Sequence, residues 1–505
     1  MRDKTMSAAQ AAALVQDGAT VAVTGSGGGL VEPDAVFAAI EQRFLAGQGA
    51  RGLTLVHSLG LGDRSERGSN RFAHEGMVRR VVGGHWTWSP RMQALARENR
   101  IEAYSLPGGV IAHLLREIGA GRPGLISHVG LGTFVDPRFG GGRMNEAARD
   151  ELVELLELDA REYLRYKPFG VDIGIVRGTY ADTAGNISLE QEPADLDGYA
   201  VALAAHNSGG KVIAQVREIV PAGQLGPRSV AIPGALVDAV VVVPQQMQTY
   251  RGSFDPSLVG HSGAFQKPPA STDLLKRIIA RRAARELRAG DSLNFGFGAS
   301  AMVASLIAEN GRAADYWMTI EQGIHGGHMI DDDLFGMAHH PAVIIDSPSQ
   351  FDFYSGGGLD MAFLGMAEMD GAGNVNVSKL NGNVNGPGGF IDISQNAKTV
   401  VFCGTFDAKG SQVRVEAGRL QVQQHGRIRK LVEAVAHITF SGAQALRRGQ
   451  RVLYITERAT FELTPAGVAL TEVAPGVDLQ RDVLAQMDFA PLVREVGAYP
   501  AEVMQ

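Results

Sequence analysis

The two halves of this chain repeat the same succession of motifs, and this repeat limits its possible folds more than any other feature. Four pairs of matching segments occur in the same order: 18–27 with 290–298, 53–56 with 318–321, 171–187 with 359–375, and 207–213 with 396–401. Matches that keep their order are hard to obtain by chance, so we infer two homologous domains.

The repeat also predicts an insertion in the first copy. Gly25 and Gly185 are 160 positions apart, whereas Gly296 and Gly373 are 77 apart, a difference of 83. We place most of this excess in the segment 57–145. A chain of 505 residues is in any case long enough for two or more domains.

Short β-branched runs alternate with helical stretches along both halves. Examples are 19–23 before a glycine turn and a helix beginning near Pro33, and the runs 126–130 and 240–243. This alternation predicts an α/β fold, with two homologous open α/β domains around mostly parallel sheets and an active site between them. We expect domains at 1–243 and 272–505, joined by a linker at 244–271 that is rich in Gln, Gly, Ser and Pro.

Composition removes several classes of function. Lys and Arg number 47 against 54 Asp and Glu, and this net charge of −7 argues against a nucleic-acid partner or an anionic membrane surface. No run is long enough to span a membrane, and no signal-peptide core follows Met1, so we expect a cytoplasmic protein. Cys403, the only cysteine, lies in an apolar strand. His325 and His328 near an acidic run show no ligand spacing, so no metal is expected.

Glu321 is the strongest candidate for chemistry. It ends the predicted strand 317–320 and precedes a loop with three glycines, where a backbone can approach a ligand closely. The repeat aligns it with Val56, so the fold itself does not need an acid at this place. A solvated loop glutamate is the alternative interpretation.

Glycine loops supply further candidates. Gly388 and Gly389, in Asn385-Gly-Pro-Gly-Gly389, carry N–H groups that could face an oxygen that gains charge. The loops at 25–29 and 296–298 follow strands but lack the spacing of a dinucleotide fingerprint. They indicate only a phosphate-bearing or acyl ligand near a helix N-terminus, or plain turns.

These motifs together resemble class I coenzyme A transferases. Glu321 in Thr-Ile-Glu-Gln-Gly-Ile-His-Gly-Gly is similar to the active-site glutamate motif of that family, and the segments 294–298, 355–360, 370–374 and 386–389 resemble further blocks. The segments 454–458 and 474–479 are similar to the fused, single-chain branch of acetate or propionate CoA-transferases.

The resemblance implies an enzyme that moves coenzyme A (CoA) between a short-chain acyl-CoA and a free carboxylic acid. Glu321 would be the nucleophile and form a glutamyl-CoA thioester. It would be ionised already at pH 7, with Gly388 or Gly389 at the oxyanion. Residues expected beside the acyl-CoA substrate are Asn294, Gly296, Gly298, Gly386, Gly388 and Gly389. No tightly bound cofactor is expected.

Alternatives and departures accompany this interpretation. Two alternative functions remain open, an acyl-CoA hydrolase on the same scaffold and a non-catalytic acyl-CoA-binding regulator.

Two residues depart from the family pattern. Gln322 stands where the family usually has Ser, Asn, Thr or Ala, and Gly108 stands where related enzymes often carry Gln. We expect Gly108 to leave a larger or less polar pocket, and we expect a homo-oligomer, either a dimer or a tetramer.

Overall fold

The computed structural model describes residues 3–260 and 272–505, and its contacts divide the chain into two compact units. The first unit comprises 1–265, 320–352 and 379–392, and the second comprises 266–319, 353–378 and 393–505. Segments after residue 319 therefore pack with the N-terminal half. The predicted boundaries 1–243, 244–271 and 272–505 were drawn from the sequence repeat, whereas the two units are defined by contacts, so these boundaries stay a prediction. Residues 261–271 of the predicted linker lie outside the described residues.

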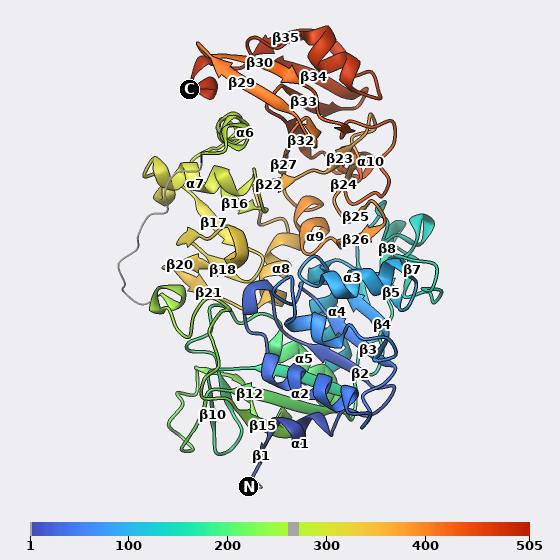
Figure 1. Ribbon diagram of the computed structural model, residues 1–505, viewed down its shortest axis with the longest axis vertical. Coiled ribbons are helices and arrows are strands. Elements are labelled where there is room, and N and C mark those ends of the chain that lie inside the picture. Colours follow the sequence, from blue (N-terminus) through green and yellow to red (C-terminus); the bar gives the residue numbers. More distant parts are fainter. Residues whose placement is uncertain (1–2, 261–271) are drawn as a thin grey trace. The chain divides into compact units, whose positions relative to one another are not determined.

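The first unit is built on a parallel sheet. Its strand order is β1-β15-β12-β9-β2-β3-β4-β5, and every neighbouring pair is parallel. The strands are Thr5–Met6, Ala239–Val242, Lys211–Val216, Ile173–Arg177, Thr20–Val23, Leu53–His57, Val78–Gly83 and Glu102–Ser105 in that order. The inner strands are rich in Val, Ile and Leu and buried on both faces, as expected where helices cover a parallel sheet (Figure 1).

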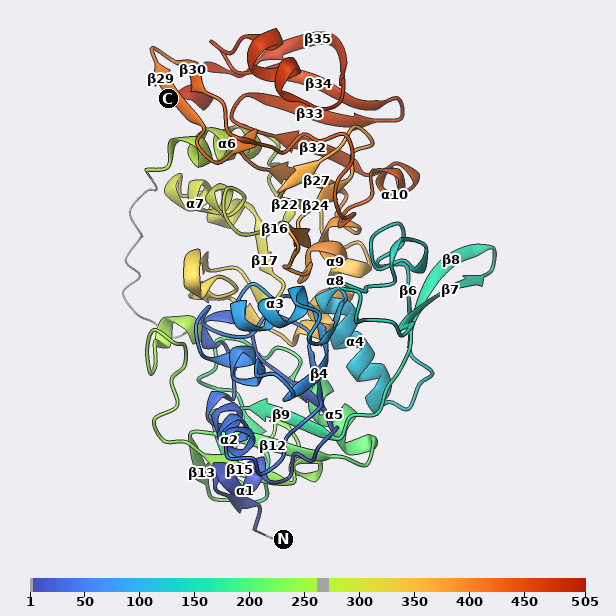
Figure 2. The same cartoon turned by 45° about the vertical axis from the view of Figure 1, so that its right-hand side comes forward.

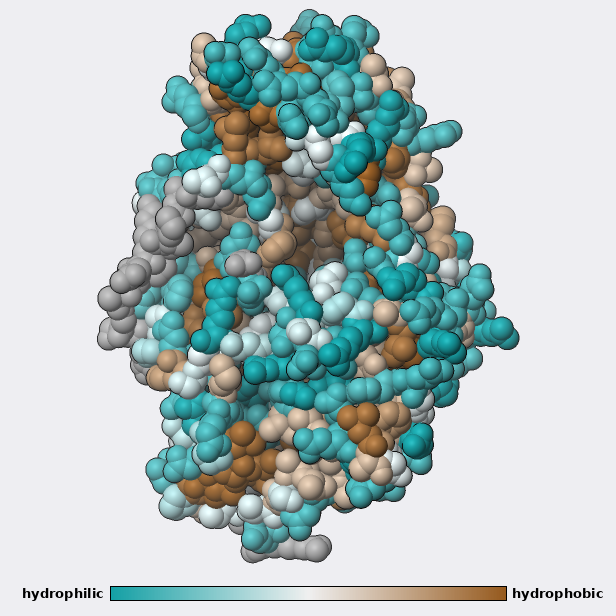
Figure 3. Space-filling view, in the orientation of Figure 1, coloured by the Kyte–Doolittle hydropathy of each residue, from teal (hydrophilic) through white to brown (hydrophobic). Residues whose placement is uncertain are grey.

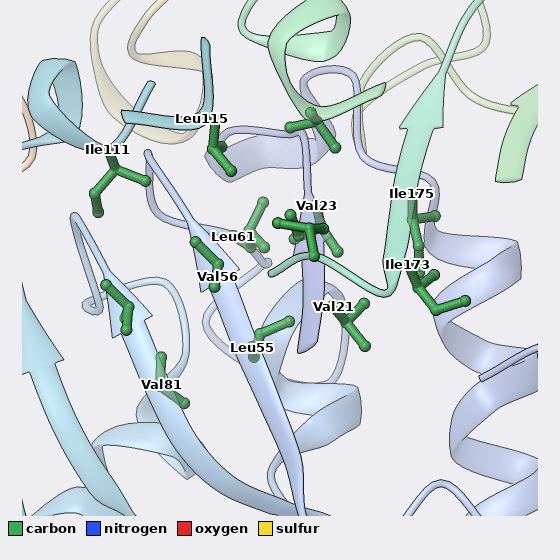
Figure 4. Packing of buried hydrophobic residues seen from close by; sticks show 14 of the residues in the cluster. Val21, Val23, Leu55, Val56, Leu61, Val81, Ile111, Leu115, Ile173 and Ile175 are labelled. Atoms are coloured by element: carbon green, nitrogen blue, oxygen red, sulfur yellow. The ribbon is translucent and has the colours of Figure 1, made fainter. Parts of the chain in front are cut away.

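Helices of the first unit cover this sheet. They are α1 (Ala8–Ala12), α2 (Asp34–Leu45), α3 (Pro90–Arg97), α4 (Gly108–Gly119) and α5 (Gly198–Asn207). Ile111 and Leu115 of α4 belong to the same hydrophobic cluster as Val56 of β3 (Figure 4). α4 also packs closely on α5, because a Cβ at Gly119 would lie 2.7 Å from Leu203 Cγ. Only glycine permits this approach of the two helices.

Smaller sheets complete the first unit. β10 (Tyr180–Asp182), β11 (Ile187–Ser188), β13 (Glu218–Val220) and β14 (Val230–Ile232) form one of them. β6 (Leu125–Ser127), β7 (Val153–Leu158) and β8 (Arg161–Tyr166) form another, and the β7–β8 hairpin projects outward (Figure 2). The strand predicted at 126–130 is therefore wrong in extent, since β6 ends at Ser127 and pairs antiparallel with β8 rather than joining the parallel sheet.

The remaining strands of the first unit lie in its later segments. They are β18 (Ile324–His325), β19 (His328–Met329), β20 (Ala338–His339), β21 (Val343–Ile344), β25 (Lys379–Leu380) and β26 (Asn383–Val384). Two helices, α8 (Ser347–Ser355) and α9 (Phe390–Ser394), run across the boundaries between the units.

The second unit repeats the core of the first. Its main strands follow the order β17-β16-β22-β27-β32-β33-β34-β35. They are Trp317–Ile320, Ser292–Phe295, Met361–Gly365, Thr399–Cys403, Arg451–Ile455, Ala459–Thr464, Gly467–Val473 and Leu492–Ala498. Pairing is parallel from β17 to β32, and then β33 and β34 each pair antiparallel with the strand before.

The second unit also contains α6 (Leu274–Ala284), α7 (Ala301–Glu309) and α10 (Gly442–Arg447). Six further strands of this unit form three antiparallel pairs: β23 (Glu368–Met369) with β24 (Val375–Asn376), β28 (Asp407–Ala408) with β31 (Ile428–Arg429), and β29 (Gln412–Glu416) with β30 (Arg419–Gln424). The face seen in Figure 3 is mostly hydrophilic, with hydrophobic residues in separate patches.

Strand order confirms the predicted repeat. The series β15-β12-β9-β2-β3 in the first unit matches β32-β27-β22-β16-β17 in the second. The predicted α/β fold with two homologous domains and mostly parallel sheets is therefore confirmed.

Strand register corrects one detail of the alignment. Thr54 N–H donates to Ala19 O, and Trp317 N–H donates to Asp291 O, which is the counterpart of Ala19. The parallel ladders agree, because Thr54 pairs with Thr20 and Trp317 with Ser292. The counterpart of Glu321 is therefore Ser58, and the predicted match with Val56 is wrong by two residues.

Candidate active site

Glu321 opens a tight turn that follows β17. Gly323 N–H donates to Ile320 O at 2.9 Å, and Ile345 N–H donates to Gly323 O at 2.9 Å. Gly323 has a φ of +97°, and a Cβ there would lie 1.9 Å from Ile345 O. The turn therefore requires glycine, and it holds Glu321 at a fixed point at the end of the strand.

The carboxylate of Glu321 lies against the glycine loop at 386–389. The N–H of Gly389 donates a hydrogen bond to it. A Cβ at Gly389 would lie 2.5 Å from Glu321 Oε2 and 3.1 Å from Phe351 Cε1. Gly389 is therefore needed for the close approach of a backbone N–H to this carboxylate. All of these residues belong to the first unit.

Protonation of Glu321 differs from the expectation. Burial raises the pKa of this half-buried carboxyl from 4.5 to about 7, and the hydrogen bond from Gly389 opposes the rise. The raised pKa departs from the expected ionisation at pH 7, because burial disfavours the charged form. The ionised fraction of Glu321 therefore changes most steeply around neutral pH.

The glycine loop is fixed from two sides. Gly388 N–H donates to Gly84 O at 2.8 Å, and Gly108 N–H donates to Gly388 O at 2.7 Å. Gly386, with a φ of +72°, packs so closely that a Cβ there would lie 2.5 Å from Gly84 O. The two predicted donors thus differ, since the N–H of Gly388 bonds to Gly84 while that of Gly389 bonds to Glu321.

Three residues near Glu321 were not singled out from the sequence. A Cβ at Gly388 would lie 3.9 Å from both Glu321 Oε1 and His85 Nδ1, so both side chains border this glycine. Phe351 is fully buried, and Asp392 is 1% exposed. They come from separate segments and carry no motif, so only the fold brings them together.

The other predicted ligand-binding residues lie in the second unit. Asn294 is buried, and its Nδ2 donates to Thr319 O at 3.3 Å and to Tyr354 Oη at 3.2 Å. Gly296 N–H donates to Phe363 O at 2.7 Å. Gly298 has a φ of +86° and no atom within 4 Å of a Cβ built on it, so its surroundings are open. Their predicted role at the acyl-CoA stays a prediction.

Gly108 and Gln322, the two residues that depart from the family pattern, both lie in closely packed surroundings. A Cβ at Gly108 would lie 2.9 Å from Ser58 O and 3.2 Å from the carbonyl of Gly388. The space beside Gly108 is thus filled by backbone, and the expected enlargement of a pocket there is wrong. Gln322 is buried, with Nε2 at 3.5 Å from Ser26 Oγ.

The His, Cys, Asp and Glu side chains of the described residues were compared with the requirements of a metal site and of a reactive thiol. Within residues 3–260 and 272–505 no group of three or more His, Cys, Asp or Glu side chains could hold a metal ion. Cys403 of β27 is buried, which raises the pKa of its thiol to about 12 and disfavours the thiolate. In the same described part of the chain, no helix has the length and apolar character for crossing a bilayer.

Comparison with known proteins identifies the family. Residues 5–243 match the family described as Coenzyme A transferase. The acetate CoA-transferase YdiF of Escherichia coli K12 is 43% identical over 496 residues, which cover 97% of this chain and 93% of the relative. The chain belongs to the coenzyme A transferase family.

Further relatives of this CoA-transferase agree. The caffeate CoA-transferase of Acetobacterium woodii is 43% identical over 503 residues, covering 97% of this chain and 95% of the relative. The crystal structure of the acyl-CoA transferase YdiF from E. coli O157:H7, as a thioester complex with CoA, has a TM-score of 0.94 at 41% identity, covering 100% and 96% of the two chains. The predicted family, the fold and the assignment as an enzyme are confirmed, with coenzyme A as a substrate.

Proposed function

We propose that this CoA-transferase moves CoA reversibly between a short-chain acyl-CoA and a free carboxylic acid through a glutamyl-CoA thioester on Glu321. The observation that carries the proposal is the contact between Glu321 and the N–H of Gly389. Relatives named as transferases of acetate and caffeate support the reaction class, and a relative crystallised as a thioester with CoA supports the covalent route.

Four balanced steps make up the reaction. The Glu321 carboxylate attacks the thioester carbonyl of the donor, which forms an acyl-glutamyl anhydride and releases CoA thiolate. The thiolate attacks the Glu321 carbonyl and releases the first carboxylate. An acceptor carboxylate then attacks the glutamyl-CoA thioester, and the thiolate released takes the acceptor acyl group. One thioester replaces another, and Glu321 returns as a carboxylate.

Each step passes through an oxyanion, for which Gly389 is the better donor. Its N–H is already directed at the Glu321 carboxyl, whereas the N–H of Gly388 would first have to leave Gly84 O. A backbone donor of this kind is worth about 3–4 kcal/mol in the transition state. We propose Gly388 as a support for the loop, and Asn294, Gly296, Gly298 and Gly386 as residues toward the acyl-CoA.

The acid substrates are proposed by class. Two relatives of equal identity are named for acetate and for caffeate, acids of very different size, so identity does not choose between small and bulky acids. We propose small monocarboxylic acids and their CoA esters as substrates. The homo-oligomer, either a dimer or a tetramer, stays a prediction that light scattering of the purified protein can test. The cytoplasmic location also stays a prediction.

A panel of acyl-CoA donors and acids, from acetate to caffeate, tests this function by mass spectrometry of the products. Transfer predicts that donor consumption depends on an added acid and that the CoA ester of that acid accumulates. Consumption of acyl-CoA that is independent of any acid, with free CoA as product, would instead establish a hydrolase. Binding of CoA esters without any product would establish a non-catalytic regulator.

A further inference from the structure

A second carboxyl group lies next to the site of Glu321 and has no place in the reaction described above. Asp392 is 1% exposed, and it stands three residues after Gly389. Its Oδ2 accepts a hydrogen bond of 3.2 Å from Gly109 N–H in the first turn of α4. A Cβ at Gly109 would lie 2.5 Å from Asp392 Oδ1, so the two segments meet without room for a side chain.

This hydrogen bond is part of a clamp on the glycine loop. Consecutive N–H groups at the start of α4 bond to two points of the loop segment, Gly108 to Gly388 O and Gly109 to Asp392 Oδ2. Gly389, whose N–H faces Glu321, lies between these two points in the chain. The clamp therefore holds the chain both before and after Gly389, the residue that contacts Glu321.

Phe351 fills the space behind the clamp. Its ring carbons would lie 2.6 Å from a Cβ at Gly109 and 3.1 Å from a Cβ at Gly389. The fully buried ring thus contacts both segments and leaves little room for water to replace the carboxylate of Asp392. If the carboxylate were lost, the Gly109 N–H would be left buried without its acceptor.

Three titratable groups affect Asp392 electrostatically or are affected by it: Glu321, His113 and Tyr166. Burial raises the pKa of Asp392 to about 7, the Gly109 N–H and His113 on the next turn of α4 oppose this, and repulsion by Glu321 adds to it. The buried hydroxyl of Tyr166 on β8 is the third neighbour.

We propose that Asp392 is a positioning residue for Glu321. It holds the 386–389 loop on α4 so that the N–H of Gly389 stays on the nucleophile. This inference rests on the proposed role of Glu321 as the nucleophile. It assigns no bond-making step to Asp392.

Two variants separate position from charge. Asp392→Asn keeps an oxygen acceptor for Gly109 and removes the charge, whereas Asp392→Ala removes both. Asp182→Asn is the matched control, because Asp182 is also a buried aspartate that accepts backbone N–H groups, and its partners Ala184 and Asn186 lie outside the site.

The measurement is the rate of CoA attachment to Glu321 from acyl-CoA alone, followed against pH by mass spectrometry of the intact protein. Asp392→Ala should slow attachment by about 10- to 100-fold, as expected when a reacting group is misplaced. Asp392→Asn should stay within about fivefold of wild type on the high-pH plateau. This recovery by the amide oxygen is the readout that distinguishes the hydrogen bond to Gly109 from a general loss of packing. Asp182→Asn should leave the rate unchanged.

Each outcome decides the inference. Attachment in Asp392→Asn that is as slow as in Asp392→Ala would overturn the role of the hydrogen bond to Gly109, since the amide oxygen keeps that acceptor. Attachment at the wild-type rate in a folded Asp392→Ala protein would overturn the positioning part. If wild type itself carries no CoA on Glu321, the proposed function fails instead, so the two failures are distinguishable.

Discussion

The two copies of the repeat share a scaffold but differ in what they place at one strand end. The turns at Asp182 and Asp370 show how close the likeness is. Within its turn, each aspartate accepts two backbone N–H groups and an asparagine amide, from Asn186 in one copy and Asn374 in the other. That asparagine in turn accepts a glycine N–H in both copies. Asp370 also accepts the N–H of Val435, from outside the turn.

The difference lies at the end of β3 and of β17. Ser58 follows the first strand by one residue and donates to Asp197 Oδ2 at 2.6 Å, within a buried network. Glu321 follows the second strand and faces Gly389. A common scaffold therefore presents a structural hydroxyl in one copy and a carboxylate with a raised pKa in the other.

The insertion in the first copy explains where the partners of Glu321 come from. Gly84, His85 and the first turn of α4 all fall between β3 and β9, which are farther apart in the chain than their counterparts β17 and β22. These residues hold the 386–389 loop beside Glu321. The comparison teaches that one copy carries the reactive carboxylate and the loop beside it, whereas the other copy carries residues that hold this loop in place.

Glu321→Ser would give the second copy the residue of the first, and it should cause the largest loss. Transfer should fall by at least about a thousandfold, because the carboxylate is lost and a serine hydroxyl without an activating base is a weak nucleophile. The fold should persist, since Ser58 occupies the matching strand end, and circular dichroism checks this. Glu321→Gln controls for size. A folded Glu321→Ser enzyme with near wild-type turnover would break the comparison.

Gly389→Ala should cause the next largest effect. Its methyl group would lie 2.5 Å from Glu321 Oε2, so the carboxylate or the loop has to shift. A displacement of about 1 Å can cost on the order of a hundredfold in kcat/KM. Gly170→Ala is the control, because a Cβ there would meet no atom within 4 Å. Equal kcat/KM values for the two variants would contradict the placement of Gly389.

The sequence carried enough information for the scaffold and for the position of Glu321 within it. Glycine turns after β-branched runs predict strand ends, and their repetition predicts two domains. The alignment of Glu321 with Val56 failed because a slip of two residues keeps every side chain on the same face of a strand. Only the ladder hydrogen bonds reveal Ser58 as the counterpart.

Other features of the site could not be predicted from the sequence, because they depend on contacts and burial that only the fold creates. Asp392, His85 and Phe351 surround Glu321 through contacts between segments far apart in sequence, and none of them belongs to a recognisable spacing. The expected void at Gly108 was wrong because the backbone of Ser58 and of Gly388 fills it. Ionisation at pH 7 was expected from the ordinary pKa of glutamate, which ignores burial.

The pH dependence should distinguish the two strand ends as well, since Ser58 does not titrate near neutrality. The pKa of Glu321 of about 7 predicts that kcat/KM for acyl-CoA falls up to about tenfold per unit below pH 7 and levels off above it. Because the folded pKa is raised, the contribution of Glu321 to stability is present below pH 4.5 and lost as the pH rises to about 7. Glu321→Gln should lack that loss in thermal unfolding. A flat pH profile from 5 to 8 would contradict the raised pKa.

The smallest effect on activity is expected at the shared turns. Asp182→Ala removes an acceptor of three hydrogen bonds and Asp370→Ala an acceptor of four, which should cost about 1–3 kcal/mol of stability in either copy. Transfer at 25 °C should stay within about twofold of wild type. Thermal unfolding of both variants provides the comparison, and a large loss in one copy alone would show that the turns are not equivalent.

The most direct test of the account is the covalent state of Glu321 during turnover. The protein is incubated with acyl-CoA alone, treated with borohydride, digested and analysed by mass spectrometry, with Glu321→Gln as the control. The account predicts an adduct of CoA mass on intact wild-type protein. After reduction, it predicts an alcohol at Glu321, and prior addition of an acceptor acid should abolish both signals. Transfer by a wild-type protein that never carries CoA on Glu321 would contradict it.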